Sequence, residues 1–123
     1  MKKYSRIKAL ISLDAVEYNF QQMKKNIKEG TKIIAVIKAD AYGHGAVPIA
    51  KMIQEYDYIW GFATATAQEA LQLKRAGITK PVLVIGLVFE EYYEILAENE
   101  IRMAVCDLET ARKFAEAGKK AGK

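Results

Sequence analysis

Apolar residues form two alternating patterns along the chain. Short continuous runs rich in Ile and Val are typical of strands in a parallel sheet, and stripes that recur every three or four residues are typical of helices. The runs predict strands at residues 7–13, 32–38, 57–63, 80–86 and 101–107, with 32–38 of the kind that is buried on both faces. The stripes predict helices at residues 14–30, 46–53, 66–77, 89–98 and from 108 onward.

Polar residues mark the expected ends of several helices. Asp14 with Glu17, and Thr66 with Glu69, have the spacing of a capping box, in which each residue satisfies a free backbone N–H of the other at the start of a helix. The last residues, 118–123, are small and charged, and we expect them to fray.

The serial order of strand and helix predicts an α/β fold. Strands joined through helices run parallel, with right-handed crossovers. Two architectures remain open at this point: a doubly wound open sheet, or part of a (β/α)8 barrel. Four units suffice for a small open sheet, whereas a closed barrel needs eight and typically about 250 residues.

Composition narrows the function classes. A hydrophobic content of 51% and a charged content of 28% are those of a globular protein, and the net charge of +4 is spread along the chain, so no nucleic-acid site is predicted. The apolar stretch 9–11 is too short for a signal peptide or a membrane span. The single cysteine, Cys106, fits a reducing compartment and is expected to be a buried thiol, so we expect a cytoplasmic protein.

The stretch AVIKADAYGHG, residues 35–45, carries the candidate chemistry. In both architectures ligands bind at the carboxyl ends of the strands, and Lys38 is the last residue of the predicted strand 32–38. One interpretation is a surface charge that reaches solvent. The other is a desolvated amine that acts as a nucleophile toward a carbonyl group.

The loop after Lys38 is rich in residues with special properties. Tyr42 either packs against the following helix or donates a hydrogen bond to a phosphate. Gly43 and Gly45 allow positive φ and close approach of the backbone to a ligand. His44 has no partner at metal-ligand spacing, so a structural role is favoured over catalysis and no metal site is predicted. Neither of the common glycine-rich nucleotide-binding motifs is present.

The stretch AVIKADAYGHGA resembles the pyridoxal-phosphate attachment motif of bacterial alanine racemases, usually V-K-A-[ND]-A-Y-G-H-G. The segments ISLDAVEYNFQQMKKNI and GFATATAQEALQLKRAGITKPVLVIG are also similar to that family, so the resemblance covers most of the chain. Asp40 stands where the family often has Asn.

The resemblance implies a two-domain, fold type III enzyme with an N-terminal (β/α)8 barrel that holds pyridoxal phosphate, a C-terminal β domain, and a homodimer with active sites at the interface. Such an enzyme interconverts L- and D-alanine and supplies D-alanine for peptidoglycan. By match to the motif, Lys38 would bind the cofactor covalently and act as one of two acid–base groups at the substrate Cα. Tyr42 would donate to the cofactor phosphate. The match assigns no role to Gly43, His44 or Gly45.

We therefore expect residues 1–123 to form the N-terminal portion of the barrel, about four βα units preceded by a short strand and helix, with the rest of the barrel and the C-terminal domain absent. The family's second base, a tyrosine of the C-terminal domain, has no counterpart here. We expect the 123-residue chain alone to be inactive. Strands 32–38 and 101–105 would be unpaired edges, which favours instability or self-association.

Three other functions remain open. The chain could belong to a racemase for another small amino acid such as serine, because the residues that select the side chain are not in this segment. It could belong to a non-catalytic pyridoxal-phosphate protein built on the same barrel. It could also be an open-sheet phosphate-binding module, in which Lys38 binds an anion without covalent chemistry.

Overall fold

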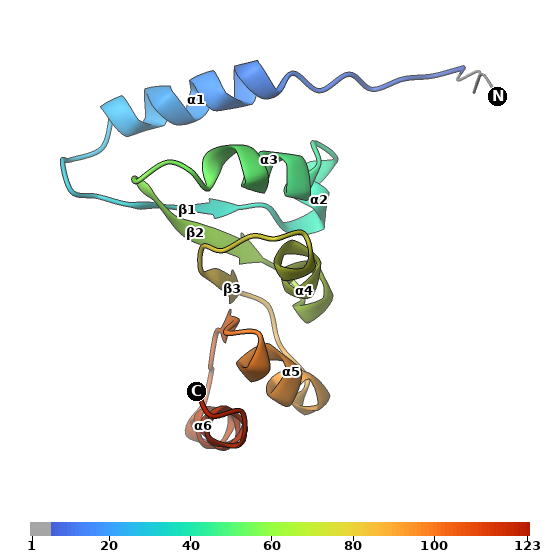
Figure 1. Cartoon of the computed structure of the whole chain (residues 1–123), viewed down its shortest axis with the longest axis vertical. Helices are drawn as coiled ribbons and strands as arrows, with labels where there is room; N and C mark the ends of the chain where they lie inside the picture. The colour runs from blue at the N-terminus through green and yellow to red at the C-terminus, as the bar shows by residue number, and fades with distance from the viewer. Residues whose placement is uncertain (1–5) are drawn as a thin grey trace.

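The computed structural model describes residues 6–123, which fold around a four-stranded sheet (Figure 1). The strands are β1 (Ile33–Val36), β2 (Ile59–Thr64), β3 (Val82–Val84) and β4 (Arg102–Met103), and each neighbouring pair is parallel. The helices are α1 (Leu13–Lys25), α2 (Lys38–Tyr42), α3 (Ala46–Ile53), α4 (Ala67–Arg75), α5 (Tyr93–Glu98) and α6 (Leu108–Lys120), with a 3-10 turn, η1 (Glu90–Tyr92), before α5.

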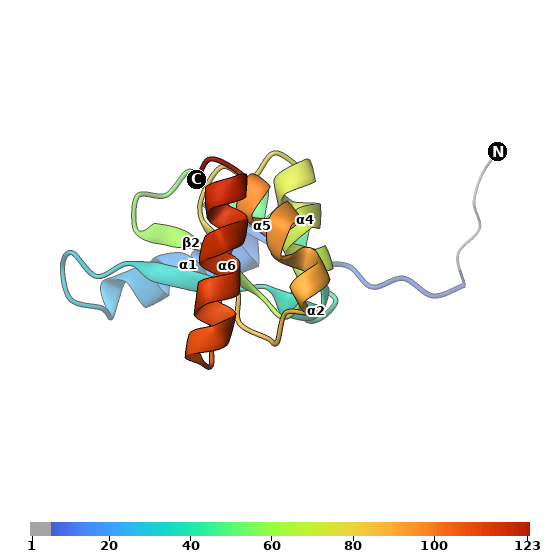
Figure 2. The same cartoon turned by 90° about the horizontal axis from the view of Figure 1, so that it is seen from below.

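The strand order separates the two architectures. The strands neighbour one another in chain order, β1-β2-β3-β4, and α3, α4 and α5 follow one another along the sheet (Figure 1). Figure 2, seen from below, shows α4 and α5 on the same side of the molecule. A doubly wound sheet reverses its order at a switch point and carries helices on both faces. An unreversed parallel order is that of one part of a (β/α)8 barrel. The predicted α/β class and partial barrel are confirmed.

Only one face of the sheet is covered by helices. In β1 the side chain of Ala35 is buried, as is that of Ile37 just beyond it, while Ile34 is 42% exposed and Val36 is 57% exposed. Ile85, after β3, is also exposed. The prediction that strand 32–38 is buried on both faces is therefore wrong, because successive side chains of a strand point to opposite faces and helices pack against one face only.

The hydrophobic core lies between the covered face and the helices. All four residues of the predicted stripe in α3 are buried: Ala46, Ile49, Ala50 and Ile53. Phe62 and Val82 pair across β2 and β3 and are fully buried on the same side. As expected, β1 and β4 are the edges of the sheet within residues 6–123. Instability or self-association of the chain stays a prediction.

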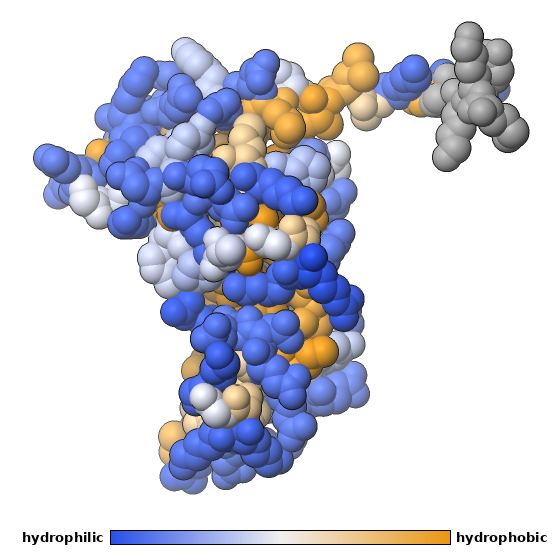
Figure 3. Space-filling view, viewed as in Figure 1, coloured by the Kyte–Doolittle hydropathy of each residue, from blue (hydrophilic) through white to orange (hydrophobic). Residues whose placement is uncertain are grey.

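The apolar run 7–13 does not form the predicted strand. Residues 7–12 lie outside the sheet, and α1 begins at Leu13, where the Ser12 hydroxyl accepts a hydrogen bond from the Ala15 N–H at 3.2 Å. This serine replaces Asp14 as the N-cap, so the predicted capping box with Glu17 is wrong. Figure 3 shows the apolar segment before α1 extending away from the rest of the molecule.

The C-terminal residues are not frayed as expected: residues 118–120 are helical, and residues 121–122 form a turn. Helix α6 continues through Lys120, and the Lys123 N–H donates to the Gly118 carbonyl at 2.9 Å. The ring of Phe114 lies edge-on to Tyr93 of α5, with centroids 5.7 Å apart. The Lys120 amine also pairs with the Glu94 carboxylate of α5 at 3.0 Å, so contacts within α6 and with α5 hold residues that composition alone indicates to be frayed. Within residues 6–123, no helix is both long enough and apolar enough to cross a bilayer.

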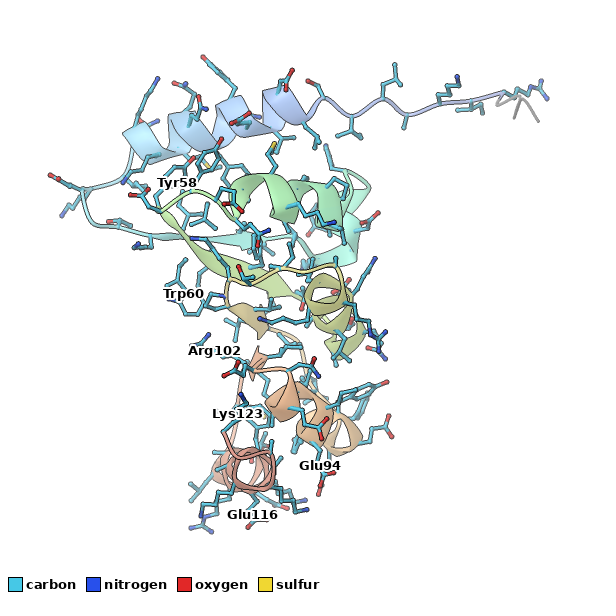
Figure 4. All side chains as sticks on the ribbon, viewed as in Figure 1. Tyr58, Trp60, Glu94, Arg102, Glu116 and Lys123 are labelled. Carbon is cyan, nitrogen blue, oxygen red and sulfur yellow. The ribbon has the colours of Figure 1, made fainter. Side chains whose placement is uncertain are left out.

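The amino ends of the strands are closely packed. A Cβ atom added at Gly61 of β2 would overlap the carbonyl oxygen of Pro81, which accepts a hydrogen bond from the Phe62 N–H at 2.9 Å. Nearby, the guanidinium of Arg102 lies 5.0 Å from the centre of the Trp60 ring (Figure 4). The close spacing of β2 and β3 therefore leaves no room for a side chain at position 61.

We predict that Gly61→Ala destabilises the protein, because the added methyl forces β2 and β3 apart. The expected loss is about 1–3 kcal/mol in the free energy of unfolding, as for other overpacked interiors. Gly118→Ala is the matched control. Its Cβ would meet only the Lys123 oxygen at 3.6 Å, and alanine in a helix is favoured over glycine by roughly 0.5–1 kcal/mol. Denaturant unfolding of both full-length variants checks this, and equal stabilities would contradict it.

Candidate functional site

The candidate site lies at the carboxyl edge of the sheet, where the chain leaves β1. The N–H of Ile37 still pairs with β2 and donates to the Ala63 carbonyl at 2.9 Å. Lys38 follows as the first residue of α2, two residues after the end of β1, so its expected place as the last strand residue is wrong by this small shift. Its expected location at the carboxyl edge is correct. Lys38 is partly buried, and within residues 6–123 its amine has no hydrogen-bond or ion-pair partner.

The segment after Lys38 turns with the left-handed sense. Its four residues have φ between 51° and 54°: Ala39, Asp40, Ala41 and Tyr42. None is glycine, and the left-handed conformation costs other residues about 1–2 kcal/mol each. The sequence indicated positive φ only at Gly43 and Gly45, which indeed have φ of 86° and 91°. The left-handed turn, residues 39–42, has no sequence signal of its own.

Asp40 stabilises this turn from within. Its backbone carbonyl accepts hydrogen bonds from the N–H groups of Gly43 (3.1 Å) and Gly45 (3.0 Å). Its side-chain Oδ1 accepts a third from the N–H of Ala46, at the start of α3, at 2.8 Å. Asp40 therefore fixes both the exit of the turn and its connection to the next helix.

Tyr42 and His44 have different surroundings. Tyr42, at the end of the left-handed turn, is 75% exposed, so it is not the partly buried ring packed against the following helix that was one of the two expectations. The Nδ1–H of His44 donates to the Ala41 carbonyl at 2.9 Å, next to the backbone bond from the His44 N–H to the same oxygen. The histidine is therefore part of the structure of the loop, in line with the role favoured from the sequence.

Glu69 connects this loop to the next βα unit. The predicted capping box at the start of α4 is confirmed, because Thr66 and Glu69 each accept from the backbone N–H of the other. The carboxylate also accepts from the Ala65 N–H at 2.8 Å and from the Ala39 N–H at 2.7 Å. Burial acts to raise the pKa of this carboxyl, but the hydrogen bonds from Ala39, Ala65 and Thr66 outweigh it and hold the pKa below its usual value. The bond to Ala39 spans thirty residues of chain, and local spacing could not predict it.

The loop after β3 also lies at the carboxyl edge of the sheet, in contact with the loop after β2. The N–H of Ile85 donates to the Thr64 carbonyl at 2.9 Å, and a Cβ atom at Gly86 would overlap the Ala65 carbonyl oxygen. Glycine is thus needed where the loops after β2 and β3 touch. Glu69 joins the loops after β1 and β2, and the contacts of Ile85 and Gly86 join the loop after β3 to them, so the loops that follow three strands form one connected surface.

Cys106 lies beyond β4 and is exposed, with its Sγ 3.4 Å from the Asp107 carboxylate. The prediction of a buried thiol is wrong, because β4 ends at Met103 and the chain has left the core by this residue. Residues 6–123 contain no group of three His, Cys, Asp or Glu side chains placed to hold a metal ion.

The edge therefore offers a primary amine that has no partner within residues 6–123 and an exposed phenol, both on one short turn. An amine of this kind can bond to an aldehyde, and a phenol can donate to a phosphate. The sequence identified both groups. It missed the left-handed turn between them and the link from Ala39 to Glu69, for which the capping box was the only available signal.

Comparison with known proteins gives one consistent result. Residues 11–123 match the family described as "Alanine racemase, N-terminal domain". Alanine racemase of Streptococcus pneumoniae (strain Hungary19A-6) is 44% identical over 102 residues, which are 83% of this chain and 27% of that protein. The chain thus spans less than a third of this relative's length.

Solved structures agree. Alanine racemase of Clostridium difficile 630 superimposes with a TM-score of 0.87 at 41% identity, over 92% of this chain and 30% of that one. The Bacillus anthracis alanine racemase with bound L-Ala-P gives a TM-score of 0.78 at 36% identity, over 87% of this chain and 28% of that one. This chain therefore belongs to the alanine racemase family, within its N-terminal domain.

Proposed function

We propose that the protein is a pyridoxal-phosphate-dependent alanine racemase, and that residues 1–123 are the N-terminal portion of its cofactor-binding barrel domain. The observation that carries the proposal is the location of Lys38 at the carboxyl edge of the parallel sheet, with its amine unpaired within residues 6–123. Active sites of parallel barrels lie at this edge. The similarity to alanine racemases over most of the chain supports the same conclusion.

The residues at this edge fit pyridoxal phosphate, because they offer a group for each end of that molecule. The Lys38 amine would bond to its aldehyde, and the Tyr42 hydroxyl would donate to its phosphate. Both side chains are available for this: Lys38 has no partner within residues 6–123, and Tyr42 is largely exposed. They lie at opposite ends of one short element, α2.

When bound, the cofactor supplies an electron sink for the charge that develops at the substrate Cα. Lys38 acts as one of the two acid–base groups that racemisation requires: its Nζ takes a proton from one face of Cα or returns a proton to it. The second group must act on the opposite face. We propose that it comes from outside the 123 residues, since these span only 27% of a relative's length. The chain alone is then expected not to racemise alanine.

We also propose the substrate of the protein, its oligomeric state and its cellular location. Alanine is supported over serine by the names of the relatives in sequence and structure. A homodimer is expected from the resemblance of the lysine motif. The cytoplasm is expected because a single cysteine suits a reducing compartment.

Reduction with sodium borohydride tests the assignment of Lys38. In the full-length protein loaded with pyridoxal phosphate, we expect the reduced pyridoxyl group on Lys38, located by peptide mass mapping. Lys32 provides an internal control, because it precedes β1 at the opposite edge and its amine donates to the Asp57 carbonyl at 2.6 Å. A label on Lys32 or on any lysine other than Lys38 would refute the assignment.

Tyr42→Phe tests the phosphate contact. A hydrogen bond to a charged group contributes about 1.5–3 kcal/mol to the free energy of binding. Without it, we expect the affinity for pyridoxal phosphate to fall roughly ten- to a hundredfold. Titration of cofactor into the cofactor-free full-length protein measures the change. Tyr18→Phe, on the exposed side of α1, is the matched control and should leave the affinity unchanged. Equal affinities of the two variants would contradict the assignment of Tyr42.

A further inference from the structure

Glu69 makes more contacts than a helix cap requires. A capping box needs the exchange between Thr66 and Glu69 at the start of α4. The Glu69 carboxylate uses Oε2 for this end of the helix, where it accepts from Thr66 at 3.1 Å and from Ala65 at 2.8 Å. Its other oxygen, Oε1, accepts from the N–H of Ala39, in the loop that follows β1, at 2.7 Å. One side chain thus joins two loops at the carboxyl edge.

The position of this bond matters because Ala39 directly follows Lys38. The Ile37 N–H, on the other side of Lys38, donates to Ala63 at 2.9 Å. The backbone is therefore fixed by the next βα unit on both sides of the lysine. The Ala41 N–H also donates to the Ile37 carbonyl at 3.0 Å, so the peptide groups before and after Lys38 are both hydrogen-bonded. These bonds set the direction in which the Lys38 side chain leaves the backbone.

Ala39 is also the first residue of the left-handed turn. An alanine in this conformation is strained, and such strain persists only where the surroundings impose it. The bond to Glu69 is charge-assisted, since the carboxylate is ionised, and such bonds are about twice as strong as neutral ones. Glu69 therefore stabilises the entrance of the turn, while Asp40 stabilises its exit.

We propose that Glu69 is a positioning residue that holds the Lys38 amine in the orientation needed to bond to the cofactor. Glu69 acts through the Ala39 peptide group and does not itself contact the reacting atoms. The inference rests on the proposed function only for the identity of the aldehyde. The link between Glu69 and the left-handed turn stands on the contacts described above.

The first test uses the cofactor-free, full-length protein. Glu69→Gln replaces one acceptor oxygen with an NH2 group, so it cannot accept on both sides. Glu69→Asp keeps the charge but is one methylene shorter, so it can serve the α4 end without reaching Ala39. Thr66→Ala is the matched control, because it removes the cap hydroxyl and leaves the Glu69 carboxylate in place. Hydrogen exchange should show a loss of protection at the Ala39 amide in both Glu69 variants and not in Thr66→Ala.

The second test measures the reaction of the lysine. We expect Glu69→Gln and Glu69→Asp to slow the covalent attachment of added pyridoxal phosphate by about tenfold or more, whereas Thr66→Ala should stay within about twofold of the unchanged protein. The absorbance of the lysine-bound cofactor follows the rate, and thermal unfolding reports the stability of each variant. If Thr66→Ala slows attachment as much as the Glu69 variants do, Glu69 acts only as a helix cap and the inference is wrong.

The two tests also separate this inference from the proposed function. Changed exchange at Ala39 with no cofactor bound to Lys38 in the unchanged protein would support the link and refute the function. Unchanged exchange and attachment in the Glu69 variants, with cofactor on Lys38, would refute the positioning role and leave the function in place. If Glu69→Gln does not fold, Glu69→Asp decides the matter by the same two measurements.

Discussion

The parallel pairing of β1 with β2 is the constraint on which the site depends. In this register Val36 pairs with Ala63, and the Ile37 N–H extends the ladder by one further bond to the Ala63 carbonyl. The loop after β1 therefore emerges beside the loop after β2. In this register the Glu69 side chain, at the start of the next helix, reaches the peptide that follows Lys38. A change of register would separate these loops and expose the opposite faces of the strands.

The pairing of β1 with β2 also stabilises a backbone conformation in residues 39–42 that is unfavourable in free energy. Four residues that are not glycine adopt the left-handed region directly after Lys38. Hydrogen bonds from the neighbouring unit and from within the loop offset the strain at its two ends, through Glu69 and Asp40 respectively. Conformational strain of this kind is concentrated at functional sites, where it fixes reacting groups before a ligand arrives. Here it lies between the amine and the phenol that we assign to the cofactor.

Much of the fold could be predicted from the sequence because its signals are local. The α3 stripe follows helical spacing, and the capping box at Thr66 and Glu69 follows from a three-residue interval. Several wrong predictions concern segments at the two ends of the described chain that composition alone does not place. Residues 7–13 have the composition of a strand but lie outside the sheet, and residues 118–123 are held by the bond from Lys123 to Gly118 and by the ion pair of Lys120 with Glu94 of α5. Within the site, the motif identified Lys38 and Tyr42, whereas the bond from Ala39 to Glu69 required the folded arrangement.

We propose that Lys38 and Tyr42 bind the two ends of one cofactor at the carboxyl edge of the sheet. A crystal structure of the full-length protein with pyridoxal phosphate tests it most directly. We expect continuous electron density between the Lys38 Nζ and the cofactor, a phosphate within hydrogen-bond distance of the Tyr42 hydroxyl, and the Glu69 carboxylate still bound to the Ala39 N–H. Cofactor bound elsewhere, or bound to another lysine, would contradict it.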